Sequence, residues 1–337
     1  MRPRRVTLIS LGGTIASTAV THGTGVVPQL GAQDLLDTVV GALNDVEVDV
    51  VTALRVPSGD LSLDDVVGLA RDVREHLEHG AHGAVVAQGT DTLEEVAFAL
   101  DLLVRSDRPV VVTGAMRHPS DVGADGPANL LGAITVAASP SARSLGVLVA
   151  FNDEVHAARF VRKTNTTNVS TFASPTTGPI GRVAEGLARI YLRPPRLYGA
   201  VDVARIDHVP PVLLFSCAVG DNGRLLERVS DLGYMGVVVE GFGGGHVPAI
   251  MVQRLGELAA RVPVVLASRT GAGDVLASTY GYDGSERDLL GRGLISAGFL
   301  DGRKSRVLLS LLLGARADAA EVANAFARVH RSATTAR

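Results

Sequence analysis

Short apolar runs without polar interruptions recur along this chain, and segments with helical periodicity lie between them. The runs occupy residues 6–9, 84–87, 109–113, 145–151, 212–217, 236–239 and 263–267. Because polar residues do not alternate within them, they predict strands buried on both faces, as in a parallel sheet. We therefore expect an α/β fold, a doubly wound and mainly parallel sheet with helices on both faces, whose ligands bind beyond the carboxyl ends of the strands.

The clearest helical pattern begins after Ser62. Ser62 and Asp65 have the spacing of a capping box, and Gly80 is a helix stop. The apolar residues between them share one helix face: Leu63, Val66, Val67, Ala70, Val73 and Leu77. We expect this helix to pack on the sheet, and a terminal helix to lie near residues 319–329.

The alternation of strands and helices fails between residues 192 and 211, where a polar stretch is interrupted by Pro194, Pro195, Gly199, Pro210 and Pro211. This segment predicts a linker. It would join a larger N-terminal domain of residues 1–191 to a smaller C-terminal α/β domain of residues 212–337.

Charge and cysteine content argue against several classes of partner. Lys and Arg total 32 against 35 for Asp and Glu, so the net charge of -3 offers no basic field, and nucleic acid is not expected as a partner. Cys217 is the single cysteine, which excludes an intrachain disulfide and a thiol metal cluster and suits the cytoplasm. No apolar run approaches the roughly 18 residues of a membrane span, so no membrane partner is expected.

Two short motifs follow predicted strands. After the first strand, a glycine pair allows a sharp turn that presents Thr14 in the crevice, although a tight turn with a buried threonine is the plain alternative. After residue 87 comes Gly89-Thr90-Asp91, with a helix close behind. Unpaired backbone N–H groups at a helix start can stabilise an oxyanion or a carboxylate, and a simple N-cap is the alternative.

Together these motifs resemble the bacterial L-asparaginase family, amidohydrolases that use threonine nucleophiles. The resemblance covers nearly the whole chain, and residues 112–117, 124–130 and 162–167 look like further family segments in family order. It implies conversion of L-asparagine to L-aspartate and ammonia without a metal or cofactor, with glutamine as a slow substrate.

The resemblance gives four residues a catalytic role. Thr14 would attack the amide carbon and form an acyl-enzyme that water then hydrolyses. Thr90 would be activated by Lys163, with Asp91 as the orienting carboxylate, in a generalised form of the serine triad. Asp91 would also pair with the α-ammonium group of the substrate. The sequence does not decide which threonine carries the acyl group, and taken alone Lys163 is an ordinary surface lysine.

Further residues would bind the substrate. The resemblance implies that Ser58 binds the α-carboxylate and that Gly59, Gly89 and Ala115 line the substrate, whereas a Ser-Gly turn before a capped helix is the plain alternative for Ser58. Family members commonly have glutamine where this chain has Gly59, so a side-chain contact is absent. Gln88 replaces a frequent histidine, which argues against a mechanism that needs histidine there.

A larger departure lies at residues 17–28, which form a tyrosine-bearing lid in the best-known members. Here the segment contains no tyrosine. Its glycines and small polar residues still predict a flexible lid, and His22 is either a solvated loop residue or a partner of Thr14.

The resemblance also implies a homodimer or homotetramer in which the second domain of a partner subunit completes each site. His246, where asparagine is common, would come from that partner, as would Tyr280 and Tyr282. A phenol of Tyr280 or Tyr282 would replace the missing hydrogen bond to Thr14. The plain alternatives are a glycine-rich turn and two ordinary interface aromatics.

Two other functions compete. Residues 270–274 are similar to the anion-hole string of ribokinase-like sugar kinases, but a kinase gives no reason for Thr14 and Lys163. An amino-acid sensor without turnover would keep Ser58 and Asp91 but would need neither Thr14 nor Lys163. We therefore expect a cytoplasmic asparaginase.

Overall fold

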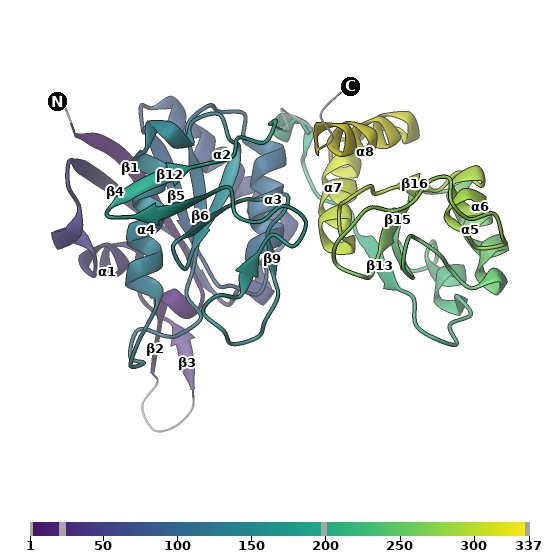
Figure 1. The fold of residues 1–337 in the computed structure, drawn as a ribbon, viewed down its shortest axis with the longest axis horizontal. Coiled ribbons are helices and arrows are strands. Elements are labelled where there is room, and N and C mark those ends of the chain that lie inside the picture. Colours follow the sequence, from purple (N-terminus) through teal and green to yellow (C-terminus); the bar gives the residue numbers. More distant parts are fainter. Residues whose placement is uncertain (1–2, 20–24, 197–200, 334–337) are drawn as a thin grey trace. The chain divides into compact units, whose positions relative to one another are not determined.

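The computed structural model describes residues 3–19, 25–196 and 201–333, and the chain divides into two units, Met1–Tyr198 and Gly199–Arg337 (Figure 1). The division falls inside the segment 192–211. Each unit has its own sheet with helices on both faces, which confirms the predicted two-domain α/β fold.

Unit 1 contains an eight-stranded sheet in the order β12-β11-β8-β7-β6-β5-β1-β4. Its strands are β1 (Arg4–Gly12), β4 (Val46–Val56), β5 (Gly83–Ala87), β6 (Val110–Thr113), β7 (Val147–Phe151), β8 (Glu154–Ala157), β11 (Gly181–Ala184) and β12 (Leu187–Ile190). The first five are parallel, and β8, β11 and β12 continue the sheet in antiparallel pairs. Every residue of β5, β6 and β7 is buried, as the apolar runs predicted.

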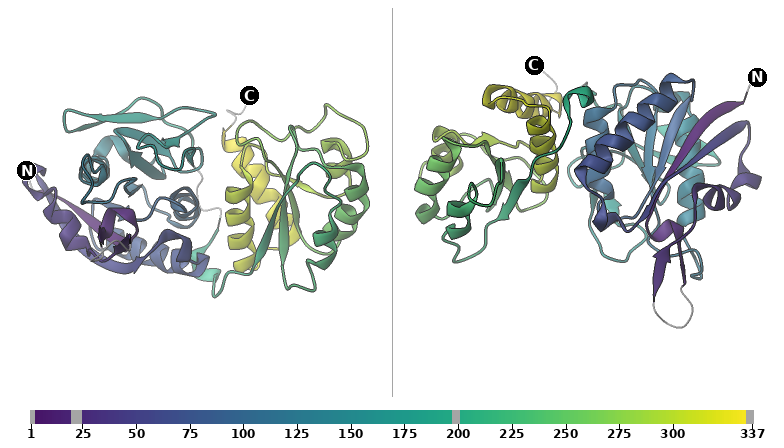
Figure 2. Two further views of the ribbon diagram at one scale, coloured as in Figure 1. Left: turned by 90° about the horizontal axis from the view of Figure 1, so that it is seen from below. Right: turned by 180° about the vertical axis from the view of Figure 1, so that it is seen from behind.

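Two pairs of helices cover this sheet (Figure 2). They are α1 (Ala32–Asp37), α2 (Leu63–Glu78), α3 (Leu93–Leu103) and α4 (Gly126–Ala138). Helices α1 and α4 share a core cluster with Val6, Leu8 and Val85, whereas α2 and α3 pack together on the opposite face. The predicted capping box is present, since the Ser62 hydroxyl accepts the Asp65 N–H and the Asp65 carboxylate accepts the Ser62 N–H.

Two small hairpins project from unit 1. Strands β2 (Ser17–Ala19) and β3 (Val26–Pro28) form the base of the expected lid, while His22 lies outside the described residues. Strands β9 (Arg162–Lys163) and β10 (Phe172–Ala173) form a two-stranded sheet that is separate from the main one. Lys163 is therefore held on a short arm.

Unit 2 contains a four-stranded parallel sheet in the order β13-β14-β15-β16. The strands are β13 (Val212–Ser216), β14 (Gly236–Gly241), β15 (Val264–Ser268) and β16 (Ile295–Ser296), and the helices are α5 (Val252–Ala259), α6 (Glu286–Gly291), α7 (Gly302–Gly314) and α8 (Ala319–Ala333). Helix α5 packs on one face with the cluster around Val237 and Val239, and α7 contacts β13 and β14 from the other. Short 3-10 helices complete the fold at Thr14–Ala16, Val40–Ala42, Ser58–Asp60, Pro140–Ala142, Val203–Arg205, Arg224–Arg228 and Ala249–Met251.

No helix within the described ranges combines the length and the apolar character that crossing a bilayer requires.

Candidate active site

The carboxyl ends of three neighbouring parallel strands bring the first site residues together. Thr14 opens a 3-10 turn directly after β1, Ser58 opens another after β4, and Thr90 follows β5. Because β1 lies between β4 and β5, the loops that follow these strands meet at one edge of the sheet.

The loops pack so closely that only glycine fits between them. Gly13 has a φ of 78° and lies against the Gly89 backbone, and a β-carbon on Gly89 would lie 2.7 Å from the Ser58 hydroxyl oxygen. The Thr14 hydroxyl has no hydrogen-bond partner among the described residues. Thr14 is therefore presented on a tight turn, and within the described part of the chain its hydroxyl is available to a ligand.

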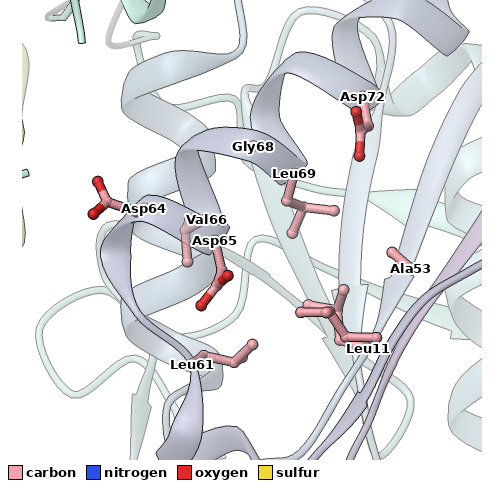
Figure 3. A pocket seen from close by; sticks show the side chains of 10 residues that line it. Leu11, Ala53, Leu61, Asp64, Asp65, Val66, Gly68, Leu69 and Asp72 are labelled. Atoms are coloured by element: carbon pink, nitrogen blue, oxygen red, sulfur yellow. The ribbon is translucent and has the colours of Figure 1, made fainter. Parts of the chain in front are cut away.

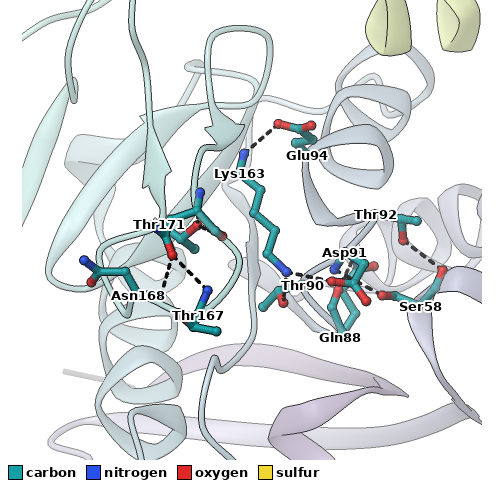
Figure 4. A network of polar contacts seen from close by, with 12 residues as sticks. Ser58, Gln88, Thr90, Asp91, Thr92, Glu94, Lys163, Thr167, Asn168 and Thr171 are labelled. Atoms are coloured by element: carbon teal, nitrogen blue, oxygen red, sulfur yellow. Dashed lines mark hydrogen bonds and ion pairs between the residues drawn. The ribbon is translucent and has the colours of Figure 1, made fainter.

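Lys163 connects Thr90 and Asp91 (Figure 4). Its Nζ atom donates to Thr90 Oγ1 at 2.9 Å and to Asp91 Oδ1 at 2.6 Å. Thr90 is buried and the Lys163 side chain is only 15% exposed, whereas the Asp91 side chain is 77% exposed. The threonine and the amine are thus shielded from water, while the carboxylate remains accessible to a ligand.

The sequence contained a signal for Lys163 that its motif alone did not carry. Of the 32 basic residues, only Lys163 and Lys304 are lysines, and both side chains are largely buried. An arginine guanidinium stays protonated in proteins, whereas a lysine amine can serve as a base. Retaining lysine at position 163 therefore fits a chemical requirement.

The expected helix lies close behind Asp91, but the backbone N–H of Asp91 is already in use. Helix α3 begins at Leu93 with Thr92 as its N-cap, and the Asp91 N–H donates to the Ser58 hydroxyl at 3.2 Å. Thr92 in turn donates its hydroxyl to the Ser58 carbonyl at 3.0 Å. The Asp91 N–H is therefore not an unpaired donor for an oxyanion, because it orients Ser58 beside Asp91.

Gln88 and Glu94 flank these residues from within the core. Gln88 is fully buried, and its side-chain amide donates weakly to the Gly89 carbonyl at 3.4 Å. Glu94 is buried in the first turn of α3 and accepts the backbone N–H of Lys163 at 2.8 Å. Sequence reasoning missed Glu94, although it lies in the string that carries Thr90.

The family-like segment 162–167 forms a braced loop behind Lys163. The side-chain oxygen of Asn165 accepts the N–H groups of Thr167 and Asn168, at 2.9 and 3.0 Å. The Thr171 hydroxyl accepts the Asn165 N–H at 2.9 Å, which closes the loop next to β10. These polar residues support the arm that carries Lys163.

The segments 112–117 and 124–130 interlock in the same way. The Asp125 carboxylate accepts the backbone N–H groups of Met116 and Arg117, at 3.0 and 2.9 Å. Asn129 donates to the Gly114 carbonyl at 3.0 Å and thereby fixes the turn that follows β6. Ala115 lies in this turn and is fully buried.

A cavity of about 240 Å³ lies between β4 and α2, and none of the predicted site residues lines it (Figure 3). Most of its lining residues are apolar, and Asp64, Asp65 and Asp72 are the charged ones. Hydrogen bonds from the Ser62 hydroxyl and backbone hold the pKa of Asp65 below its usual value, as expected for a helix-capping carboxylate. Gly59 lies apart from this cavity, and a β-carbon there would meet nothing within 4 Å.

In unit 2, His246 forms one cluster with Tyr280 and Tyr282. The His246 ring lies edge-on to both phenols, with centroids 4.9 and 5.6 Å away, and both tyrosines remain about half exposed. The buried Glu286, which sequence reasoning missed, accepts the Thr279 and Tyr280 N–H groups and lies 3.3 Å from His246 Nε2. Burial alone would raise the pKa of Glu286, but the backbone hydrogen bonds and His246 together lower it, which keeps the carboxylate charged.

The kinase-like string at residues 270–274 does not form a phosphate-binding helix start. The Thr270 hydroxyl donates to the Ala272 carbonyl, and no helix begins before α6 at Glu286. The string therefore offers no helix dipole to a bound phosphate. Within the described ranges, no three His, Cys, Asp or Glu side chains gather as metal ligands would.

Comparison with known proteins gives a consistent result. The family model described as Asparaginase, N-terminal matches residues 5–196, and the model of the Glutaminase/Asparaginase C-terminal domain matches residues 211–326. An L-asparaginase of Bacillus licheniformis is 32% identical over 92% of this chain and 95% of its own. A probable L-asparaginase of Deinococcus radiodurans is 35% identical over 96% and 97%. The crystal structure of a probable cytoplasmic L-asparaginase from Campylobacter jejuni superposes with a TM-score of 0.87 at 30% identity, covering 96% of this chain and 99% of that one.

Proposed function

The chain belongs to the asparaginase family, and from this membership we propose that it hydrolyses L-asparagine to L-aspartate and ammonia through a threonine acyl-enzyme. The observation that carries the proposal is the contact of Lys163 Nζ with both Thr90 and Asp91, beside the turn that presents Thr14. A hydroxyl, an amine and a carboxylate in this order form a generalised catalytic triad.

The reaction proceeds in two balanced steps. The Thr14 oxygen attacks the carboxamide carbon of the substrate, and the proton of the Thr14 hydroxyl goes to the leaving nitrogen. The C–N bond breaks, ammonia departs, and the aspartyl group stays on Thr14 as an ester. Water, deprotonated through Thr90 and Lys163, then attacks this ester, and L-aspartate leaves as Thr14 regains its proton. Lys163 must be neutral to accept a proton, and Asp91 stabilises its charge afterwards.

Ser58 and Asp91 bind the polar end of the substrate. The Ser58 hydroxyl accepts the backbone N–H of Asp91 at 3.2 Å, which places the two residues next to each other. Ser58 binds the α-carboxylate and the exposed Asp91 carboxylate binds the α-ammonium group, while the main chains of Gly89 and Ala115 line the carboxamide. Gly59 leaves the neighbouring space open.

A second subunit completes the site in a homodimer or homotetramer. His246, Tyr280 and Tyr282 of the partner subunit cover the crevice, and a phenol supplies the hydrogen bond to Thr14 that a lid tyrosine would otherwise give. The mutual contacts of these three rings, two of which are about half exposed, support a shared role for them. Closed symmetric assemblies are the common outcome for soluble enzymes.

The hydrolysis needs only water, so we assign no cofactor or metal. We place the protein in the cytoplasm, which its single cysteine and the cytoplasmic relative of known structure both favour.

Ammonia release from purified protein tests the proposal, with asparagine, glutamine, and a sugar plus ATP as substrates. Rapid release from asparagine and slow release from glutamine are expected, and both are lost in Thr14→Ala. Mass spectrometry of a Thr90→Ala variant quenched during turnover should find the acyl group on Thr14. Binding of asparagine without ammonia would instead identify a sensor, and turnover of the sugar alone would identify a kinase.

A further inference from the structure

The arm that carries Lys163 is not part of the main sheet. Strand β9 pairs only with β10, and together they form a separate two-stranded sheet. A lysine on such an arm can move relative to Thr90 unless another contact fixes its main chain. An error of about 1 Å in the position of a catalytic group can cost roughly 10²-fold in rate.

Glu94 supplies a contact of this kind. Its Oε2 atom accepts the backbone N–H of Lys163 at 2.8 Å, across 69 residues of sequence, and its side chain is almost completely buried (Figure 4). Glu94 lies in the first turn of α3, where the helix dipole stabilises a carboxylate. A charged acceptor also forms a stronger hydrogen bond than a neutral one.

The contacts of Lys163 at its two ends go to one short segment. Its main-chain nitrogen is bound by Glu94, and its Nζ atom is bound by Thr90 and Asp91. Residues 88–92 join β5 to α3, and Glu94 lies in the first turn of α3. Both ends of the lysine are therefore bound to the same short stretch of chain. Because contacts hold both the main chain and the amine of Lys163, they fix the direction of its side chain as well as the position of its Nζ atom.

We propose that Glu94 is a positioning residue that holds the main chain of Lys163 so that its amine stays on Thr90. This inference rests on the proposed function, in which that amine moves a proton. In this role the position of the Glu94 acceptor oxygen matters more than the negative charge of its carboxylate. Glu94 does not itself touch the substrate.

Two conservative variants separate position from charge. Glu94→Gln keeps an acceptor oxygen at the same reach and removes the charge, whereas Glu94→Asp keeps the charge and withdraws the oxygen by roughly one C–C bond length. We expect kcat to stay within about tenfold of wild type in Glu94→Gln and to fall by roughly 10²-fold in Glu94→Asp. KM should change by less than about threefold in both, because Ser58 and Asp91 are retained.

Asp101→Asn is the matched control, since Asp101 is also a buried carboxylate of α3 but accepts the N–H of Val147. Its kcat per folded molecule should equal that of wild type. A double-mutant cycle adds a readout that a purely structural role would not move: in a Lys163→Met background, Glu94→Asp should lower the residual kcat by less than about twofold.

The outcomes are distinct. A higher kcat in Glu94→Asp than in Glu94→Gln, wild-type kcat in both, or a full additive loss in the Lys163→Met background would overturn the positioning role. Wild-type activity of Lys163→Met itself would instead contradict the proposed mechanism, whatever the Glu94 variants do.

Discussion

The backbones of Gly13 and Gly89 touch, so that a β-carbon on Gly13 would lie 2.1 Å from the Cα atom of Gly89. The two threonine motifs, which are far apart in the sequence, are thus fixed against each other by the absence of two side chains. Neither glycine could be exchanged without moving Thr14 relative to Thr90.

Gly13→Ala should therefore reduce both activity and stability. The new methyl group would clash with the Gly89 backbone, and alanine disfavours the φ of 78° at this position. We expect kcat to fall by roughly 10²-fold as the threonine loops separate. Gly68→Ala is the control, because a β-carbon there meets nothing within 4 Å and alanine favours the helix. Wild-type kinetics in Gly13→Ala would show that the loops tolerate separation.

Lys163→Arg should be nearly as inactive as Lys163→Met. Arginine can still pair with the Asp91 carboxylate, but it cannot give up a proton. If Lys163 moves a proton, both variants should lose roughly three or more orders of magnitude in kcat for ammonia release, as for other members of a catalytic set. Arg182→Met, which removes an exposed ion pair with Glu154, should retain wild-type kcat. Substantial activity in Lys163→Arg would assign Lys163 an electrostatic role only.

Much of the site could be predicted from the sequence, because the end of a strand is recognised from the few residues around it. Thr14, Ser58 and Thr90 each follow a predicted or observed strand by a few residues, and parallel strands place such residues at one edge. Strand β4 contains no uninterrupted apolar run and was therefore not predicted. It is an edge strand, in which partly buried and exposed residues alternate.

Contacts between distant segments were not visible. Glu94 and Lys163 are 69 residues apart in the sequence, and Lys163 lies on a separate two-stranded arm. No periodic sequence pattern predicts that two such residues will be in contact. Glu286 is concealed for a different reason: it occupies the first turn of a capped helix, where acidic residues are common without any further role. Only the fold distinguishes these two glutamates from their neighbours.

Gly59→Gln should strengthen substrate binding. A β-carbon at Gly59 meets nothing within 4 Å, so a longer side chain has room beside Ser58, and glutamine is what family members commonly carry there. One added hydrogen bond contributes about 0.5–1.5 kcal/mol, which corresponds to a roughly twofold to tenfold lower KM for asparagine. Initial rates over a range of asparagine concentrations measure this. An unchanged KM in Gly59→Gln, with Gly59→Ala as control, would place position 59 outside the substrate contact.

Tyr280→Phe should lower kcat while leaving the assembly intact. Only a hydroxyl is removed, and the phenyl ring can still pack edge-on against His246. Loss of a catalytic hydrogen bond costs roughly tenfold to a thousandfold. Kinetics and analytical ultracentrifugation of Tyr280→Phe and Tyr282→Phe, with the exposed Tyr191→Phe as control, test the assignment. Wild-type kcat in both cluster variants would leave another group as the partner of Thr14, and an active monomer would refute the shared site.

His156 should make the protein less stable in mild acid. Burial lowers the pKa of His156 from 6.5 to about 4. The unfolded chain therefore binds a proton between these values that the folded protein does not, so the free energy of unfolding falls as the pH drops through this range and is unaffected above it. Between pH 7 and pH 5 this group alone should remove about 2 kcal/mol.

Urea unfolding of wild type and His156→Gln at both pH values measures the effect of this histidine. Glutamine keeps a polar partner for the Ser174 hydroxyl, which lies 3.0 Å from His156 Nδ1, but does not titrate. The stability of His156→Gln relative to wild type should therefore rise by about 2 kcal/mol as the pH is lowered from 7 to 5. His79→Gln removes an exposed histidine and serves as the control for the loss of an imidazole. A difference between wild type and His156→Gln that stays constant with pH would mean that His156 titrates alike in the folded and unfolded chain.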